Sequence, residues 1–154
     1  MKVILMRGLP GSCKSTKGRK LSQEYDAVIC SADFFFEELG EFDAAKLSQA
    51  HNFCKNAFIN ALGSNKNVIV DNTNTTYSEM EFYIEYAKEK HEIYLVYSDS
   101  DWRNDINECY RKTIHNVPLE TIKKMAARFE SHEVIINKAK TNIKNEADLK
   151  MEIK

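Results

Sequence analysis

The stretch GLPGSCKST, from Gly8 to Thr16, constrains the fold of this chain more than any other segment. It matches the phosphate-binding pattern G-x-x-x-x-G-K-[ST], except that Cys13 occupies the position of the second glycine. The apolar run KVILMR (2–7) precedes it and predicts a strand, and a helix is expected to begin at Ser15. Strand, loop and helix in this order form the context in which the pattern binds phosphate.

In a loop of this kind, backbone N–H groups and the following helix N-terminus surround the β-phosphate of a nucleotide. The Lys14 side chain would reach the β- and γ-phosphates, and the Ser15 hydroxyl would bind Mg²⁺. The residues predicted to bind nucleotide here are Gly8, Gly11, Ser12, Cys13, Lys14, Ser15 and Thr16.

Glycine is usual at the position of Cys13 because the backbone must approach the phosphate closely. A side chain there would cost about 1 kcal/mol if φ is positive, and much less if the backbone is helical. We therefore expect Cys13 to weaken binding without abolishing it.

The rest of the chain alternates short apolar runs with longer helical patterns. Strands are predicted at 27–30, 67–71 and 92–98, and helices at 43–62, 77–90, 101–112 and 118–130. This alternation predicts a single α/β domain over residues 1–154, with a parallel sheet covered on both faces. The segment 137–154 is polar and weakly patterned, and we expect it to be peripheral.

Composition restricts the class of protein. The chain has 154 residues, 43% of them hydrophobic, and a formal net charge of −1. These values are typical of a soluble globular protein and do not favour one that coats nucleic acid. No apolar run is long enough to cross a membrane and the N-terminus is unlike a signal peptide, so a cytoplasmic location is expected. The four cysteines have no metal-binding spacing and are expected to be reduced.

Carboxylates follow two of the predicted strands. Asp33 lies just beyond the second strand, where it could accept a proton from an attacking hydroxyl or serve as a helix N-cap. Asp71 ends the third strand and could contact Mg²⁺ through water. Asn72 and Asn74 follow at the same edge, where turn formation is the alternative explanation for them.

Basic residues in the segment CYRKTIHNVPLETIKKMAARFES suggest a helical lid. Arg111 and Lys112 close one helix, and a loop containing Pro118 opens the next, which carries Arg128. Such cations could fold over the phosphates and stabilise the charge that develops in phosphoryl transfer. Solvated helix faces with ordinary C-terminal cations would give the same pattern.

The segments RGLPGSCKST, SADFFF, AHNFC, VIVDNTN and CYRKTIHNVPLETIKKMAARFE together resemble, in this order, the P-loop polynucleotide 5′-hydroxyl kinases. This group includes the kinase domain of phage polynucleotide kinase/phosphatase and related AAA-type ATP-binding proteins. The resemblance implies a kinase-type three-layer α/β fold with about four parallel strands and a helical lid. It also implies a reaction, which is Mg²⁺-dependent transfer of the γ-phosphate of ATP, or of another nucleoside triphosphate, to the 5′-hydroxyl of DNA or RNA in end repair.

The resemblance further implies roles for individual residues. Asp33 matches the general base, and Arg111, or else Lys112, matches the phosphate-clamping cation of the lid. Asn72 or Asp71 matches the polar residue that faces the acceptor. The full set predicted to bind the acceptor is Asp33, Phe34, Phe36, Asp71, Asn72, Asn74 and Arg128.

The sequence departs from the family pattern at Cys13 and at Phe36, where phage members carry an arginine that holds the acceptor's phosphate. Phe34, Phe35 and Phe36 could stack a terminal base, although three consecutive aromatic residues on a helix cannot share one face, so at least one is expected in the core.

Two alternatives remain open. One is a P-loop kinase of a small molecule such as a nucleoside or a sugar acid, and the other is a non-catalytic nucleotide-binding module. The N-K-x-D and D-x-x-G motifs of GTPases are absent from the sequence. The sequence does not specify an oligomeric state.

Overall fold

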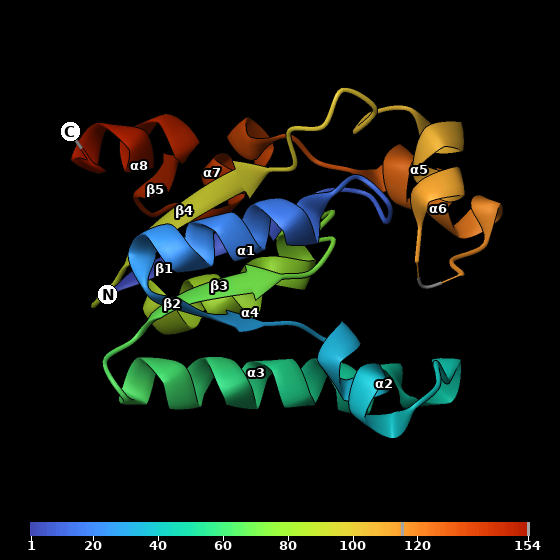
Figure 1. Ribbon diagram of the computed structural model, residues 1–154. Coiled ribbons are helices and arrows are strands. Elements are labelled where there is room, and N and C mark those ends of the chain that lie inside the picture. Colours follow the sequence, from blue (N-terminus) through green and yellow to red (C-terminus); the bar gives the residue numbers. More distant parts are fainter. Residues whose placement is uncertain (115, 154) are drawn as a thin grey trace.

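The computed structural model of the chain describes residues 1–114 and 116–153 (Figure 1). Its centre is a five-stranded parallel sheet with the strand order β2-β3-β1-β4-β5. Consecutive strands that run parallel must be joined by crossovers, and the helices provide them. The strands are β1 (Lys2–Arg7), β2 (Ala27–Cys30), β3 (Asn67–Asp71), β4 (Glu92–Tyr97) and β5 (Ile143–Asn145).

Helices separate the strands and also extend beyond the carboxyl edge of the sheet, on the right in Figure 1. Those that follow the first three strands are α1 (Lys14–Tyr25), α2 (Asp33–Leu39), the short 3₁₀ turn η1 (Ala44–Lys46), α3 (Leu47–Gly63) and α4 (Tyr77–Ala87). Those that follow β4 and β5 are α5 (Ile106–Lys112), α6 (Leu119–Arg128), α7 (His132–Ala139) and α8 (Glu146–Ile153).

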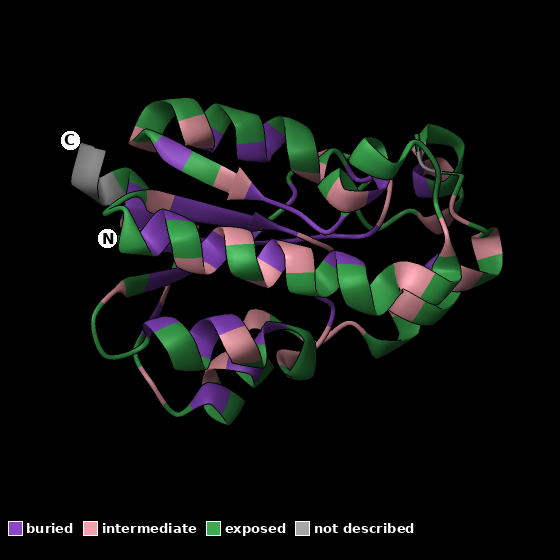
Figure 2. Cartoon of the chain, turned by 90° about the horizontal axis from the view of Figure 1, so that it is seen from below, coloured by how far each residue is buried: buried purple, intermediate pink, exposed green. Residues whose placement is uncertain are grey.

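Alternation along the strands creates three layers, because successive side chains point to opposite faces of a sheet. Val3 and Leu5 pack into the larger core, which lies between the sheet and the helices α3, α4 and α7. Ile4 and Met6 pack into the smaller core, toward α1 and α8. Figure 2 shows the consequence, since the strands are mostly buried whereas α1 and α3 are exposed on their outer sides.

The sheet register brings the end of β1 beside the end of β3. Met6 pairs with Asp71, so the loop that follows Arg7 begins next to the carboxylate that closes β3. Ligands of open α/β sheets bind at this carboxyl edge.

The predicted strands agree with the observed ones to within one residue. The predicted helix at 101–112 was wrong at its start, because α5 begins only at Ile106. Asp105 caps this helix by accepting a hydrogen bond from the Glu108 N–H, and residues 98–105 form a loop that follows β4.

The prediction that 137–154 is peripheral was also wrong. Ile143 pairs with Ile93 of β4 and adds a fifth strand to the expected four. Leu149 of α8 is 1% exposed, and its carbonyl accepts a hydrogen bond from the Tyr25 hydroxyl on α1. The C-terminal segment is therefore part of the packed domain.

A buried lysine joins α1 to this segment. The Lys17 ammonium lies 2.7 Å from Glu146 and 3.2 Å from Asp99, and it donates to the carbonyl of Tyr97. These contacts connect α1, the loop after β4 and the start of α8. A lysine that is 8% exposed needs such partners, because an isolated buried charge is strongly destabilising.

Within the described residues, 1–114 and 116–153, no helix has both the length and the apolar composition required to cross a membrane.

Replacing Leu149 with alanine tests whether the C-terminal segment stabilises the domain. Removing a fully buried leucine side chain should lower the free energy of unfolding by about 2–5 kcal/mol. Urea denaturation measures this, with Lys150→Ala as the exposed control on the same helix, for which a change below about 0.5 kcal/mol is expected. Equal stabilities for the two variants would contradict the role of α8.

His132 provides a second test, through pH. Its ring stacks on Tyr97 with centroids 3.5 Å apart, and burial together with the charge of Arg7 lowers the pKa of His132 to about 3. Between the ordinary pKa of about 6.5 and this value, the unfolded chain binds a proton that the folded chain does not. The free energy of unfolding should therefore fall as pH drops through this range.

His132→Phe keeps the stacked ring but removes the titrating group. Urea titrations at pH 7, 5 and 4 should show a weaker loss of stability on acidification for the variant than for the unmodified protein. Identical pH dependence in the two proteins would contradict the assignment.

Candidate active site

The loop after β1 is shaped by two residues with positive φ. Gly11 has φ of 79°, and a Cβ built on it would lie 2.0 Å from the carbonyl oxygen of Cys109. Only glycine fits there, because the backbone of α5 occupies the space that a side chain would need. Cys13 has φ of 66°.

The loop is braced from the segment that follows β4. The Ser100 hydroxyl donates to the carbonyl of Ser12 at 2.9 Å, and the indole N–H of Trp102 donates to the carbonyl of Gly11 at 2.9 Å. These contacts fix the orientation of two consecutive peptides of the loop. Neither Ser100 nor Trp102 was predicted as a site residue, because nothing in their sequence context distinguishes them from other loop residues.

Cys13 occupies the N-cap position of α1 in the left-handed conformation, with its thiol exposed and without a side-chain capping bond. Left-handed backbone costs a non-glycine residue about 1–2 kcal/mol. Of the two conformations considered from the sequence, the strained one is therefore observed. The loop keeps the shape that glycine would allow, at a cost in stability.

Lys14 and Asp71 form an ion pair at the base of the loop. The ammonium lies 3.6 Å from Asp71 Oδ1, and both side chains are at most 10% exposed. Oδ1 is buried and has no hydrogen-bond partner. Ser15 is exposed in the first turn of α1. A buried carboxylate oxygen that accepts no hydrogen bond, together with an exposed hydroxyl in the first turn of α1, is compatible with Mg²⁺, which typically takes one or two protein oxygens together with phosphate and water.

Asp33 is the first residue of α2 and is exposed at the carboxyl edge of the sheet. The N-cap position belongs to Ala32, and the Asp33 N–H donates to the Ser31 hydroxyl at 3.2 Å. The alternative in which Asp33 is the N-cap of this helix is therefore wrong. Its carboxylate is instead presented at the start of the helix.

Asn72 connects the end of β3 to the helix that carries Asp33. Its Oδ1 accepts the Ala32 N–H at 3.0 Å, and its Nδ2 lies 3.6 Å from the Cys54 sulfur. Burial raises the pKa of Cys54, which also accepts a hydrogen bond from the Tyr83 hydroxyl at 3.2 Å. The amide of Asn72 thus fixes the position of Asp33.

Asn74, which was predicted to bind the acceptor, is instead buried against partners within the protein. It is 1% exposed, its Nδ2 donates to the carbonyl of Met6 at 2.7 Å, and its own carbonyl accepts from Arg7 Nε. Its φ of 45° suits asparagine, which adopts left-handed backbone more readily than most residues. Asn74 therefore shapes the loop after β3.

Phe36, which was predicted to bind the acceptor, is instead a core residue. It is 9% exposed and packs against Phe35 and Phe42, with ring centroids 5.4 and 4.9 Å apart. The expectation that one of the three consecutive phenylalanines is in the core is confirmed. Phe34, at 36% exposed, is the most accessible of them.

Arg128 is held by the loop after β3. Its Nε donates to the Thr75 hydroxyl at 2.9 Å, and its Nη2 lies 3.3 Å from Glu79. The guanidinium is half-exposed, but its contacts fasten the end of α6 to the body of the domain. These contacts are all within the protein, and the contact of Arg128 with an acceptor stays a prediction.

Helices α5 and α6 form the predicted lid. Their shared small core includes Leu9 of the loop together with Cys109 and Ile122. At the end of α5, Arg111 is 72% exposed and paired with Glu108. The structure therefore places the lid directly on the phosphate-binding loop.

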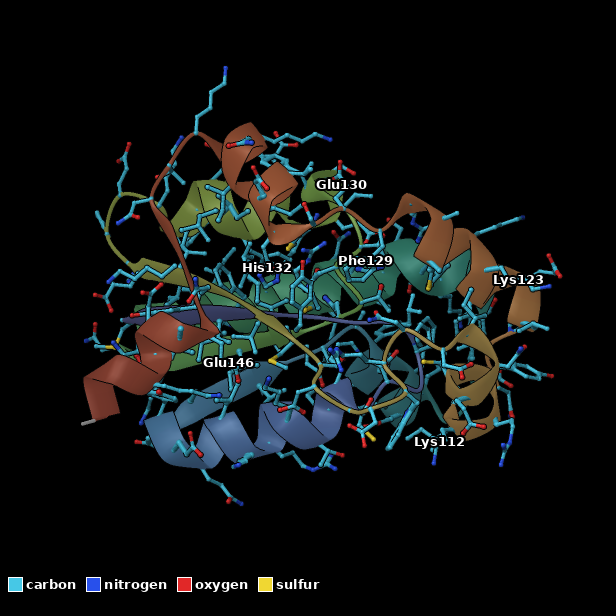
Figure 3. All side chains as sticks on the ribbon, turned by 90° about the horizontal axis from the view of Figure 1, so that it is seen from above. Lys112, Lys123, Phe129, Glu130, His132 and Glu146 are labelled. Carbon is cyan, nitrogen blue, oxygen red and sulfur yellow. The ribbon has the colours of Figure 1, made fainter. Side chains whose placement is uncertain are left out.

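The other predicted lid cation, Lys112, has its ammonium 4.2 Å from the Trp102 ring centroid. Figure 3 shows Lys112 and Lys123 on this helical pair, apart from Phe129, Glu130 and His132.

Arg7 was not predicted as a site residue, although an arginine at the end of an aliphatic strand is an unusual signal. It is fully buried, donating from Nη2 to the carbonyls of Thr75 at 3.1 Å and Glu130 at 2.6 Å. Its guanidinium lies 4.7 Å from the Phe129 ring centroid. Arg7 thus joins β1, the loop after β3 and the end of the lid.

Comparison with known proteins places this geometry in a family. A family model described as an AAA domain matches residues 3–132. The chain belongs to the AAA domain family. It is a P-loop kinase-type domain, as the resemblance in sequence implied. Human NEDD4-binding protein 2 is 34% identical over 136 residues, which are 83% of this chain and 8% of that protein. This chain therefore spans only a small part of that relative.

Solved structures support the fold. A chain of the Pnkp1/Rnl/Hen1 RNA repair complex has a TM-score of 0.66 at 21% identity, and the match covers 93% of this chain and 47% of that chain. A gluconokinase from Sinorhizobium meliloti 1021 has a TM-score of 0.56 at 15% identity, covering 84% of this chain and 75% of that one. This chain thus shares its overall fold with both of these structures.

Replacing Cys13 tests the backbone strain in the loop. Cys13→Gly should raise the free energy of unfolding by up to about 1 kcal/mol, because the left-handed conformation no longer opposes a side chain. Cys13→Val should lower it by about 1–2 kcal/mol, because branching at Cβ makes this conformation still less favourable. Urea denaturation measures both variants, and a valine variant as stable as the unmodified protein would rule out the strain.

Proposed function

We propose that the domain is a polynucleotide 5′-hydroxyl kinase that transfers the γ-phosphate of ATP, or of another nucleoside triphosphate, to the 5′ end of DNA or RNA. The observation that carries this proposal is the arrangement along the sheet edge. Among the adjacent strands β2, β3 and β1, Asp33 follows β2, Asp71 is the last residue of β3, and Lys14 follows the loop after β1. A proton acceptor, a metal-binding carboxylate and a phosphate-binding lysine therefore lie in sequence along one edge.

Each residue has a defined task in this reaction. Backbone N–H groups between Gly8 and Thr16 surround the phosphates, and Lys14 neutralises the β- and γ-oxygens. Ser15 would hold Mg²⁺, with Asp71 as a further ligand through water, and the cation would supply additional charge neutralisation on the transferred phosphoryl group.

The oxygen of the 5′-hydroxyl attacks the γ-phosphorus, and Asp33 receives the proton of that hydroxyl. The bond between the γ-phosphorus and the oxygen of the departing nucleoside diphosphate breaks. Arg111 or Lys112 stabilises the charge on the phosphoryl oxygens when the lid closes. Phe34 is the exposed aromatic next to Asp33, and we assign to it the stacking of a terminal base.

Similarity of fold to an RNA repair complex supports a nucleic-acid acceptor, and the sequence resemblance points the same way. The gluconokinase match shows that this scaffold also accommodates a small acceptor. The acceptor class is therefore the question that an experiment must answer first.

Phosphate transfer from γ-labelled ATP to a 5′-OH oligonucleotide tests the proposal. Asp33→Asn should lower kcat by about 10²–10⁴-fold, since general-base catalysis contributes that much, and should leave the KM for ATP nearly unchanged. Glu37→Gln is the matched control, because this exposed carboxylate lies one turn further along α2, and it should retain the activity of the unmodified protein.

A parallel panel of thymidine, adenosine and gluconate tests the acceptor class. Transfer to one of these but not to an oligonucleotide would replace the proposal with a small-molecule kinase. Binding of ATP without transfer to any acceptor would indicate a nucleotide-binding module instead.

A further inference from the structure

A cavity lies between the ends of β1 and β4 and the end of the lid. Its volume is about 540 Å³, within the range of small-molecule sites. It is bounded by the ends of β1 and β4, the loop after β4, and the end of α6. The wall residues that matter most are Arg7, Leu9, Tyr97, Arg103, Ala126 and Phe129.

This cavity is separate from the predicted nucleotide site. It shares Gly8 and Leu9 with the loop, but its wall contains none of the residues from Gly11 to Thr16. Asp33 and Asp71, which serve the proposed reaction, are also absent from it.

Arg7 gives the cavity a buried positive charge. Nε and Nη2 bind three backbone carbonyls, whereas Nη1 is buried with no hydrogen-bond partner. Within the described part of the chain, no carboxylate forms an ion pair with this guanidinium. A buried donor that carries charge and lacks a partner is costly, and an anion at Nη1 would offset that cost.

The charged side chains that line the cavity are both arginines. Arg103 adds a second guanidinium at the wall, and the residues that line the cavity include no aspartate or glutamate. The two carboxylates near Arg7 are engaged elsewhere, Glu79 with Thr75 and Arg128, and Glu130 with Tyr77 and Lys138.

The remaining wall suits a planar apolar group. Tyr97 and Phe129 contribute aromatic rings whose centroids are 6.2 Å apart. Aliphatic surface comes from Leu9, Ile106 and Ala126. Figure 3 shows Phe129 beside His132, whose ring is stacked on Tyr97. The combination of two arginines, aromatic rings and aliphatic side chains matches a small aromatic anion.

We propose that this cavity is a binding site for a small aromatic anion, with Arg7 Nη1 as the principal donor to its phosphate or carboxylate group. The occupant contacts the first residues of the phosphate-binding loop, Gly8 and Leu9. The proposal does not depend on which acceptor the domain phosphorylates.

Binding is measured with the P-loop saturated with AMP-PNP and Mg²⁺, so that a probe cannot occupy the donor site. The probes are phenyl phosphate, benzoate and inorganic phosphate, with benzyl alcohol as the uncharged control. Isothermal titration calorimetry gives the affinity. Trp102, the only tryptophan of the chain, reports binding by fluorescence because it neighbours Arg103.

Saturable 1:1 binding of phenyl phosphate or benzoate, without binding of benzyl alcohol, is expected. Stronger binding of phenyl phosphate would identify a phosphorylated ligand, and stronger binding of benzoate a carboxylate. Inorganic phosphate should bind more weakly than phenyl phosphate, because it leaves the aromatic wall unused.

Ala126→Phe fills the cavity from α6 and should weaken binding of the better probe at least tenfold. Ala127→Phe is the matched control, because this neighbouring residue is exposed and does not line the cavity, and it should bind like the unmodified protein. If Ala126→Phe fails to fold, Arg103→Gln takes its place and should weaken binding several-fold.

Three results would overturn the proposal. One is the absence of saturable binding of either aromatic anion. Another is equal affinity in the cavity variant and its control. The last is binding that is seen in a parallel titration without AMP-PNP but not in its presence, which would assign the cavity to the nucleotide site.

Discussion

The buried guanidinium of Arg7 is the interaction on which the site depends. It stands at the last position of β1, and its hydrogen bonds reach the carbonyls of Asn74, Thr75 and Glu130. Hydrogen bonds to a charged group contribute about 1.5–3 kcal/mol each, and losing them would leave a buried charge unsatisfied. One side chain thus holds the end of β1, the loop after β3 and the segment that follows α6 in fixed relation.

The fold was predictable where residues repeat a physical pattern. The four strands predicted from β-branched and aromatic runs are all observed, because inward-facing apolar side chains on both faces leave a clear record in the sequence. The fifth strand was missed, since β5 spans three residues and only Ile143 among them is buried. Helix α8 was missed for a similar reason, because Leu149 is its one buried anchor among the residues whose burial is described.

The site was predictable only where function demands an unusual residue. The loop from Gly8 to Thr16 could be identified because its conformation requires glycines and the binding of phosphate requires Lys14. By contrast, Asn74 and Arg128 are polar residues at the correct edge that turn out to satisfy backbone and side-chain partners within the protein. Sequence does not distinguish a polar residue that contacts a ligand from one that binds partners within the protein, because tertiary packing decides the partner of a polar side chain. The role of Arg7 was hidden for the same reason.

The pairing of β5 with β4 affects where the C-terminal boundary of this domain should be drawn. The family match ends at residue 132, yet β4 continues to pair beyond that boundary with Ile143. A fragment cut at the family boundary would leave β4 as an unprotected edge, a template on which another chain could add a strand. It would also remove Glu146 from the Lys17 ammonium, leaving Asp99 as its only ion-pair partner among the described residues. The cooperative folding unit is therefore longer than the stretch by which the family is recognised.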